Sequence, residues 1–262
     1  MDVYEKTILE LSPTLMYLIL YFQGEPYLHP EFFQMISLAS GNDIYTATST
    51  NGHYLNGENA KTTVSSGLDR LIISVDGTTQ ETYENYRIGG NLEKVLEGAR
   101  QVVSWKKQMQ SPTPHLVFQF LVVKQNEHQL SELQQIAKDI GIDQVTFKTA
   151  QIYNYKNGSD LIPTQDRYAR YRQLGNGKWE LKNDLEDRCW KMWHSSVVTW
   201  DGKIVPCCFD KDAKHQLGSM TNNTFEDIWN GVEYNNFRRS LFQSRKSIDI
   251  CQNCTEGTKI FA

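Results

Sequence analysis

Cysteine is absent from the first 188 residues of this 262-residue chain. The five cysteines all fall in the last 74 residues, at Cys189, Cys207, Cys208, Cys251 and Cys254. An odd number of cysteines, with no basic-then-apolar signal segment at the start, argues against a disulfide framework. Reduced thiols gathered in one region, two of them spaced as CxxC, indicate ligands of a metal ion or cluster instead.

Long hydrophobic runs and an excess of positive charge are also lacking. The apolar stretch Leu15–Phe22 has eight residues, whereas a helix needs about 20 to cross a bilayer. The chain has 27 basic against 31 acidic residues and a net charge of −4, which argues against a nucleic-acid surface. We therefore expect a soluble, cytoplasmic protein that binds neither nucleic acid nor membrane.

The chain is 39% hydrophobic, which is enough to bury a core. Its first 150 residues alternate between a pattern typical of strands and one typical of helices. Short apolar, β-branched runs predict strands at 15–21, 44–48, 71–75, 116–123 and 144–149. Segments with helical spacing lie between them, at 30–41, 92–103 and 130–140. Repeated strand–helix units predict an α/β fold with parallel strands, either a barrel or an open doubly wound sheet.

Two further segments follow with different textures. Residues 151–185 are polar and punctuated by Asn, Gly and Pro, so we expect a linker there. Residues 186–262 predict a small α+β cysteine-rich domain, with a hairpin around Asp201-Gly202 and short helices at 225–229 and 234–242. The predicted domains are thus 1–150, a linker 151–185, and 186–262.

Polar, small residues follow each predicted strand. In parallel α/β folds, ligands bind beyond the carboxyl ends of the strands. A single loop of this kind is better explained as an ordinary βα turn, which uses Gly, Asn and Asp for backbone freedom. The five loops together, at 23–26, 49–52, 76–79, 124–127 and 148–151, favour a binding face.

Several motifs match one family. The segment Gln23-Gly24-Glu25-Pro26, after an apolar strand, resembles the GGEP motif of radical S-adenosylmethionine (SAM) enzymes. The segments 49–52, 73–77 and 86–90 follow in the order that this superfamily shows. The cysteine-containing tail looks like the SPASM/twitch extension of the same superfamily. The resemblance implies a partial radical-SAM-type (βα) barrel followed by a small α+β SPASM/twitch domain.

The resemblance also implies two sets of site residues. The backbone at Gly24 and Glu25 would hold the SAM amino group, while polar groups on later strands would contact its ribose and carboxylate. The candidates for that second role are Ser49, Asn51, Ser74 and Arg87. Gln23 replaces the first glycine of the motif, which would alter the approach to SAM.

Cys189, Cys207, Cys251 and Cys254 are the candidate metal ligands. Four thiolates can hold either zinc or an iron–sulfur cluster. The separations of 17 and 43 residues before the CxxC favour a cluster over a zinc knuckle, and the resemblance implies one auxiliary [4Fe–4S] cluster. Cys208 is expected to be a packed thiol.

The chain departs from the family in one respect, because the CxxxCxxC motif that holds the SAM-cleaving cluster is absent. An N-terminally truncated chain is the favoured interpretation, and a degenerate homologue is the other.

The resemblance implies that a full-length form would carry a second [4Fe–4S] cluster and act as a radical SAM oxidoreductase or substrate-modifying enzyme. Its partners would be an electron donor and a small-molecule or peptide substrate. The 262 residues alone are expected not to cleave SAM, and no catalytic residue is assigned. A non-catalytic binding homologue and an α/β barrel with structural zinc are the alternatives.

Overall fold

The computed structural model describes residues 1–256, whose contacts form two compact units. One unit is Leu15–Glu180, and the other combines Met1–Thr14 with residues 181–256. None of the helices in the described part is long and apolar enough to cross a membrane.

The unit Leu15–Glu180 is built on one parallel sheet. Its strands are β1 (Tyr17–Ile19), β2 (Tyr45–Thr50), β3 (Arg70–Ser74), β4 (His115–Val122) and β5 (Gln144–Thr149). The strands pair in the order of the sequence, β1-β2-β3-β4-β5. Because parallel crossovers are right-handed, winding in one direction places the connecting helices on one face, as in a barrel and unlike a doubly wound sheet. The predicted parallel α/β architecture is confirmed.

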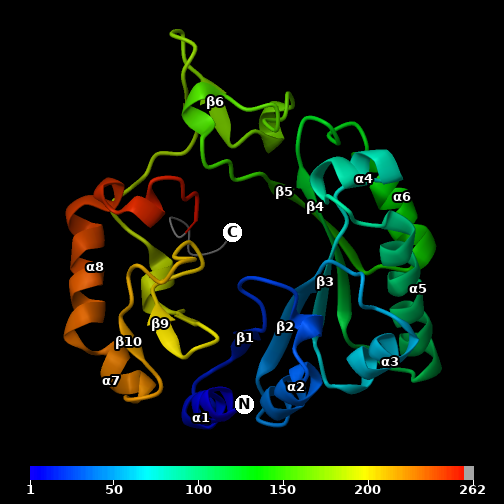
Figure 1. Cartoon of the computed structure of the whole chain (residues 1–262), viewed down its shortest axis with the longest axis horizontal. Coiled ribbons are helices and arrows are strands. Elements are labelled where there is room, and N and C mark those ends of the chain that lie inside the picture. Colours follow the sequence, from blue (N-terminus) through cyan, green and yellow to red (C-terminus); the bar gives the residue numbers. More distant parts are fainter. Residues whose placement is uncertain (257–262) are drawn as a thin grey trace. The chain divides into compact units, whose positions relative to one another are not determined.

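Five helices connect or follow these strands: α2 (Phe32–Ser40), α3 (Gly57–Ser65), α4 (Gln80–Tyr86), α5 (Leu92–Gln108) and α6 (Leu130–Ile140). Figure 1 shows them along one face of the sheet. The side chains of Asn56, Thr79 and Asn91 cap α3, α4 and α5 by accepting a backbone N–H three residues on. The chain leaves α6 through Gly141 in the left-handed conformation (φ +94°).

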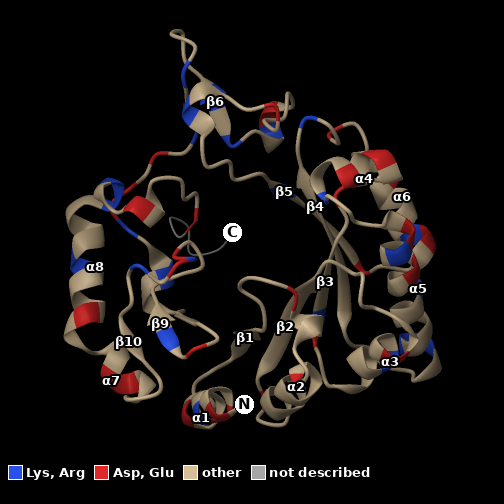
Figure 2. Cartoon of the chain, viewed as in Figure 1, with Lys and Arg blue, Asp and Glu red and all other residues tan. Residues whose placement is uncertain are grey.

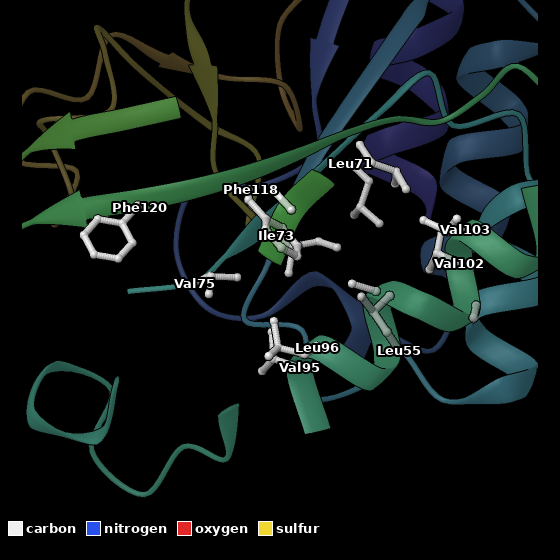
Figure 3. Packing of buried hydrophobic residues seen from close by; sticks show 14 of the residues in the cluster. Leu55, Leu71, Ile73, Val75, Val95, Leu96, Val102, Val103, Phe118 and Phe120 are labelled. Carbon is white, nitrogen blue, oxygen red and sulfur yellow. The ribbon is translucent and has the colours of Figure 1, made fainter. Parts of the chain in front are cut away.

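The main core lies between the sheet and these helices. Ile73 of β3 and Phe118 of β4 are fully buried, as are Val95 and Val102 of α5. Figure 3 shows these strand and helix side chains within one packed cluster. The charged residues of α5 and α6 include both signs along the same helices (Figure 2). The apolar stripe predicted for α5 is therefore its buried face.

The second unit combines the first helix, α1 (Asp2–Leu11), with the cysteine-rich region. That region holds η4 (Trp190–Trp193), β8 (Val197–Val198), β9 (Lys203–Val205), β10 (Gly218–Ser219), α7 (Phe225–Trp229), α8 (Val232–Ser244), η5 (Arg245–Ser247) and η6 (Asp249–Cys251). The predicted hairpin forms, with Val197 opposite Val205 in an antiparallel pair. Lys6 Nζ donates to the carbonyl oxygen of Met220 at 2.6 Å and joins α1 to this unit.

This grouping differs from the division expected from the sequence, which placed α1 with the barrel. Val3 of α1 packs in the same apolar cluster as Ile204 and Met220, so α1 has its apolar contacts in the cysteine-rich unit.

The stretch expected as a linker contains short regular elements: η2 (Tyr155–Asn157), η3 (Asp166–Tyr168), β6 (Tyr171–Gln173) and β7 (Trp179–Leu181). The Tyr171 hydroxyl accepts the Ile152 N–H at 2.7 Å, which anchors part of this stretch.

Replacement of Ile73 by Ala should destabilise the Leu15–Glu180 unit by about 2–5 kcal/mol, since the fully buried side chain would leave a cavity. The matched control is Ile88→Ala, at a side chain that is 92% exposed, with an expected change within about 0.5 kcal/mol. Urea unfolding measures both. Equal effects of the two variants would contradict this assignment of the core.

Candidate functional site

The loop after β1 carries the Gly-Glu-Pro segment. Gly24 has φ +80°, and nothing lies within 4 Å of the position that a Cβ would take, so its backbone is open to a ligand. The Glu25 carboxylate accepts the Asn51 N–H at 2.7 Å and the Thr50 hydroxyl at 2.8 Å. It also accepts the Tyr27 N–H at the start of η1 (Pro26–Leu28). The Glu25 side chain therefore joins two neighbouring loops, while its carbonyl oxygen accepts the Leu28 N–H at 3.1 Å.

Asn51 is fixed from a second side by His53. Its Oδ1 accepts the His53 N–H at 2.9 Å, and His53 Nε2 accepts the Asn91 N–H at 2.8 Å. Because Nε2 is an acceptor, the ring proton belongs on Nδ1, which lies 3.1 Å from the Asn51 carbonyl oxygen. His53 thus connects the end of β2 to the start of α5.

Arg87 is held by a buried carboxylate. Its Nε donates to Asp76 Oδ2 at 2.6 Å, while Asp76 Oδ1 accepts the Leu121 N–H at 2.6 Å. Burial raises the pKa of Asp76, and the Arg87 charge and these hydrogen bonds partly offset that rise. Asn126 Nδ2 donates to the Asp76 carbonyl oxygen at 3.0 Å. The ends of β3 and β4 are therefore bonded to each other, and Arg87 after α4 is bonded to the same carboxylate.

The face of the sheet opposite the helices carries polar side chains. Ser49 pairs with Ile72, and Ser74 lies two residues further along β3, so both serines are on this face. Ser74 is opposite Gln119, which in turn is opposite Thr146. The hydroxyl of Thr146 is buried and has no hydrogen-bond partner within the described residues 1–256. We call Ser49, Ser74, Gln119 and Thr146 the open-face polar set.

The four candidate metal ligands line a single cavity in the second unit, the cysteine cavity. Cys189 lies at the N-terminus of η4, Cys207 follows β9, and Cys251 and Cys254 flank the turn after η6. Apolar side chains of Met192, Phe237 and Leu241 complete much of its wall, and Lys191 and Arg245 also line it. The structure thus brings together three segments that are far apart in the sequence.

The environment of these thiols disfavours a bare negative charge. Burial raises the pKa of Cys207 to about 12 and that of Cys251 to about 11. A thiol with such a pKa stays protonated at neutral pH unless a metal replaces the proton. Burial would lower the pKa of the Arg245 guanidinium, but the neighbouring thiols raise it above its usual value. Buried thiols and nearby cations together fit a negatively charged thiolate-bound centre.

Two neighbouring residues take no part in this cavity. Cys208 is exposed and is absent from the cavity wall, so it is not the packed thiol that we expected. The carboxylate of Asp210 accepts the N–H groups of Lys214 and His215, both at 2.8 Å, and stabilises a turn. Within residues 1–256, no three His, Cys, Asp or Glu side chains converge closely enough to hold a single metal ion.

Sequence reasoning missed Arg245, Lys191, Gln119 and Thr146. Lys191 lies two residues after Cys189, and Arg245 lies six residues before Cys251, so proximity to a ligand was the available signal. Gln119 and Thr146 occur within predicted strands, where a polar residue in an apolar run marks a side chain that needs a partner. Predicted Gly24, Glu25 and Asn51 lie together, whereas Arg87 is bound to Asp76.

Two family models match this chain. Residues 5–104 match the radical SAM superfamily, and residues 189–255 match the SPASM iron–sulfur cluster-binding domain. The chain therefore belongs to the radical SAM superfamily and carries a C-terminal SPASM domain. The resemblance inferred from the motifs is confirmed.

The chain is also similar to curated proteins named for a modification or cyclisation reaction. The chain is 25% identical over 250 residues to the tungsten-containing aldehyde ferredoxin oxidoreductase cofactor-modifying protein of Pyrococcus furiosus, covering 82% of this chain and 67% of that protein. It is 26% identical over 268 residues to the PqqA peptide cyclase of Gluconobacter oxydans, covering 94% and 72%. These relatives and the radical SAM match identify an enzyme.

Solved structures share the fold. The structure of anSMEcpe with bound AdoMet matches with a TM-score of 0.66 at 16% identity, covering 97% of this chain and 75% of that chain. Streptococcus suis SuiB bound to S-adenosylmethionine matches with a TM-score of 0.65 at 11% identity, covering 97% and 64%. At these identities the similarity concerns the fold alone.

Replacement of Glu25 by Ala should release the loop after β2, because the Asn51 N–H would lose a charged acceptor at 2.7 Å. Hydrogen bonds to charged groups contribute about 1.5–3 kcal/mol, which predicts at least a roughly tenfold faster amide exchange in segment 49–53. Hydrogen–deuterium exchange with mass spectrometry measures it. Glu81→Ala, at an exposed residue, is the control. Unchanged exchange in Glu25→Ala would rule out this role of the carboxylate.

Proposed function

We propose that the cysteine-rich unit holds one auxiliary [4Fe–4S] cluster through Cys189, Cys207, Cys251 and Cys254. The observation that carries this proposal is that all four thiols line one cavity with two cationic side chains. Four thiolates can also hold a single zinc ion with Zn–S bonds of about 2.3 Å, but the separations of 17 and 43 residues between Cys189, Cys207 and the CxxC favour the larger centre. In a [4Fe–4S] cluster each thiolate binds a different iron, so the four sulfurs lie further apart than around a single zinc ion.

We further propose that the Leu15–Glu180 unit binds SAM at the carboxyl ends of its strands. The backbone at the exposed Gly24 and the half-buried Glu25 would receive the amino group, and Asn51 would lie beside it because Glu25 holds the two loops together. Ser49 and Ser74 would bind polar groups of SAM from the sheet face that helices leave open. Arg87 would act at the rim, oriented by Asp76.

The resulting enzyme would be a substrate-modifying radical SAM oxidoreductase. SAM supplies hydrogen-abstraction chemistry in this superfamily when an adjacent cluster reduces it. The substrate class that we propose is a peptide or a small molecule, because the named relatives modify a peptide or a cofactor. An external electron donor would supply the reducing equivalents. The residues of this chain would bind and orient these groups.

Replacement of any one of the four ligand cysteines by Ala should abolish the auxiliary cluster in anaerobically prepared protein. About four irons and four sulfides per chain are expected before replacement. Cys208→Ala is the matched control, because this exposed neighbour of Cys207 does not line the cavity. Iron, sulfide and zinc analysis measures the outcome. Stoichiometric zinc without iron, or cluster loss in Cys208→Ala alone, would overturn the assignment.

The 262-residue chain should not cleave SAM. Reductive cleavage needs an iron with an open coordination position, and the cavity offers four thiolates to a cluster of four irons. No cysteine precedes Cys189 to provide a second set of ligands. The reconstituted chain is incubated with dithionite and SAM and assayed for 5′-deoxyadenosine, with a radical SAM enzyme that has CxxxCxxC as positive control. Catalytic formation of 5′-deoxyadenosine by this chain would refute the prediction.

A further inference from the structure

Arg245 lies against the cysteine cavity and is 1% exposed. Its backbone N–H donates to Asp187 Oδ1 at 2.7 Å, and its Nη1 donates to the carbonyl oxygen of Arg188 at 2.9 Å. Its Nη2 donates to the Glu256 carbonyl oxygen at 2.7 Å and to Cys254 Sγ at 3.3 Å. The guanidinium is thus held from both sides and directed at one ligand sulfur.

A buried guanidinium is costly unless negative charge compensates it. Among the residues that the structure describes, no carboxylate forms an ion pair with this side chain, and its Nε is buried without a hydrogen-bond partner. The acceptors of its Nη groups are two carbonyl oxygens and the Cys254 sulfur, and the Cys251 thiol also interacts with the guanidinium. The compensating charge therefore belongs with the cysteines, which would be thiolates when they bind a cluster.

Lys191 is the other cation at this cavity, but it is already paired. Its Nζ lies 3.0 Å from Glu256 Oε2, and its side chain is 32% exposed. Its field at the cavity is therefore partly neutralised by Glu256 and screened by water. Arg245 has no carboxylate partner among residues 1–256 and is 1% exposed. Of the two cations, Arg245 has the stronger effect on a centre in the cavity.

We propose that Arg245 is a positioning residue that orients the Cys254 sulfur by a hydrogen bond and raises the reduction potential of the auxiliary cluster by its positive charge. This inference rests on the cluster assignment under the proposed function. Reduction adds one electron from the external donor to the cluster, with no bond formed or broken, and makes the centre more negative. Hydrogen bonds to sulfur and nearby positive charge favour that more negative state.

The test uses the full 262-residue chain, loaded anaerobically with iron and sulfide. Arg245→Met keeps much of the side-chain length but removes the charge and every donor of the guanidinium. Its matched control is Arg239→Met, at an exposed arginine of α8. A potentiometric titration with dithionite, followed by electron paramagnetic resonance, gives the midpoint potential of each protein.

The expected result is that Arg245→Met is harder to reduce by at least about tenfold in equilibrium constant, which is about 59 mV for one electron. Arg239→Met should titrate as the unmodified chain does. Arg245→Lys keeps the charge without the planar fork, and its potential should lie between the two. A cluster-loaded Arg245→Met with an unchanged potential would overturn the inference. An unmodified chain that binds no cluster would instead overturn the proposed function.

A second measurement needs no variant and decides the matter if Arg245→Met does not fold. The unmodified chain is produced with arginine labelled with ¹⁵N in the guanidinium group, and the reduced cluster is examined by pulsed electron paramagnetic resonance. A ¹⁵N coupling to the cluster spin is expected, because Nη2 bonds directly to a ligand sulfur. Absence of ¹⁵N coupling in a loaded, reduced sample would contradict the hydrogen bond and with it the inference.

Discussion

The cysteine-rich unit depends on one constraint, which is that four thiols are gathered in one cavity with little access to water. The charged side chains placed around that cavity can be understood from the burial of the thiols. A buried thiol disfavours its charged form, as the raised pKa values of Cys207 and Cys251 indicate. The surrounding segments bring positive charge to the same place, through Arg245 and Lys191. The unit therefore contains donors that ionise when metal binds, together with cations that stabilise the ionised state.

The Leu15–Glu180 unit obeys a different constraint. Its strands follow one another in the sheet, so α2–α6 cover one face (Figure 1), and polar side chains of the open-face polar set lie on the other. The strand ends on this sheet are bonded to their neighbours through the carboxylates of Glu25 and Asp76. A rim fixed in this way can present backbone groups and hydroxyls to a ligand in a defined geometry.

Strong patterns in the sequence predicted much of this structure. The five strands, α5 and α6 have clear apolar periodicity, and α7 matches the predicted 225–229. Helix α3 was missed because its sequence GENAKTTVS starts with glycine and is rich in threonine, and α4 because it is short with only Tyr83 buried. The positions of the cysteines in the sequence were enough to group them. Arg245 could be identified only from the fold, which places its guanidinium beside Cys254. Long-range partners of that kind leave no periodic signal in the sequence.

The most direct test of the central claim is X-ray absorption at the iron edge on the anaerobically loaded chain. The account predicts sulfur scattering around each iron together with iron–iron scattering from a cubane, at about four irons per chain. It also predicts that both signals disappear when Cys251 is replaced by Ala. Iron without iron–iron scattering, or a chain that holds only zinc with four sulfur neighbours at about 2.3 Å, would contradict it.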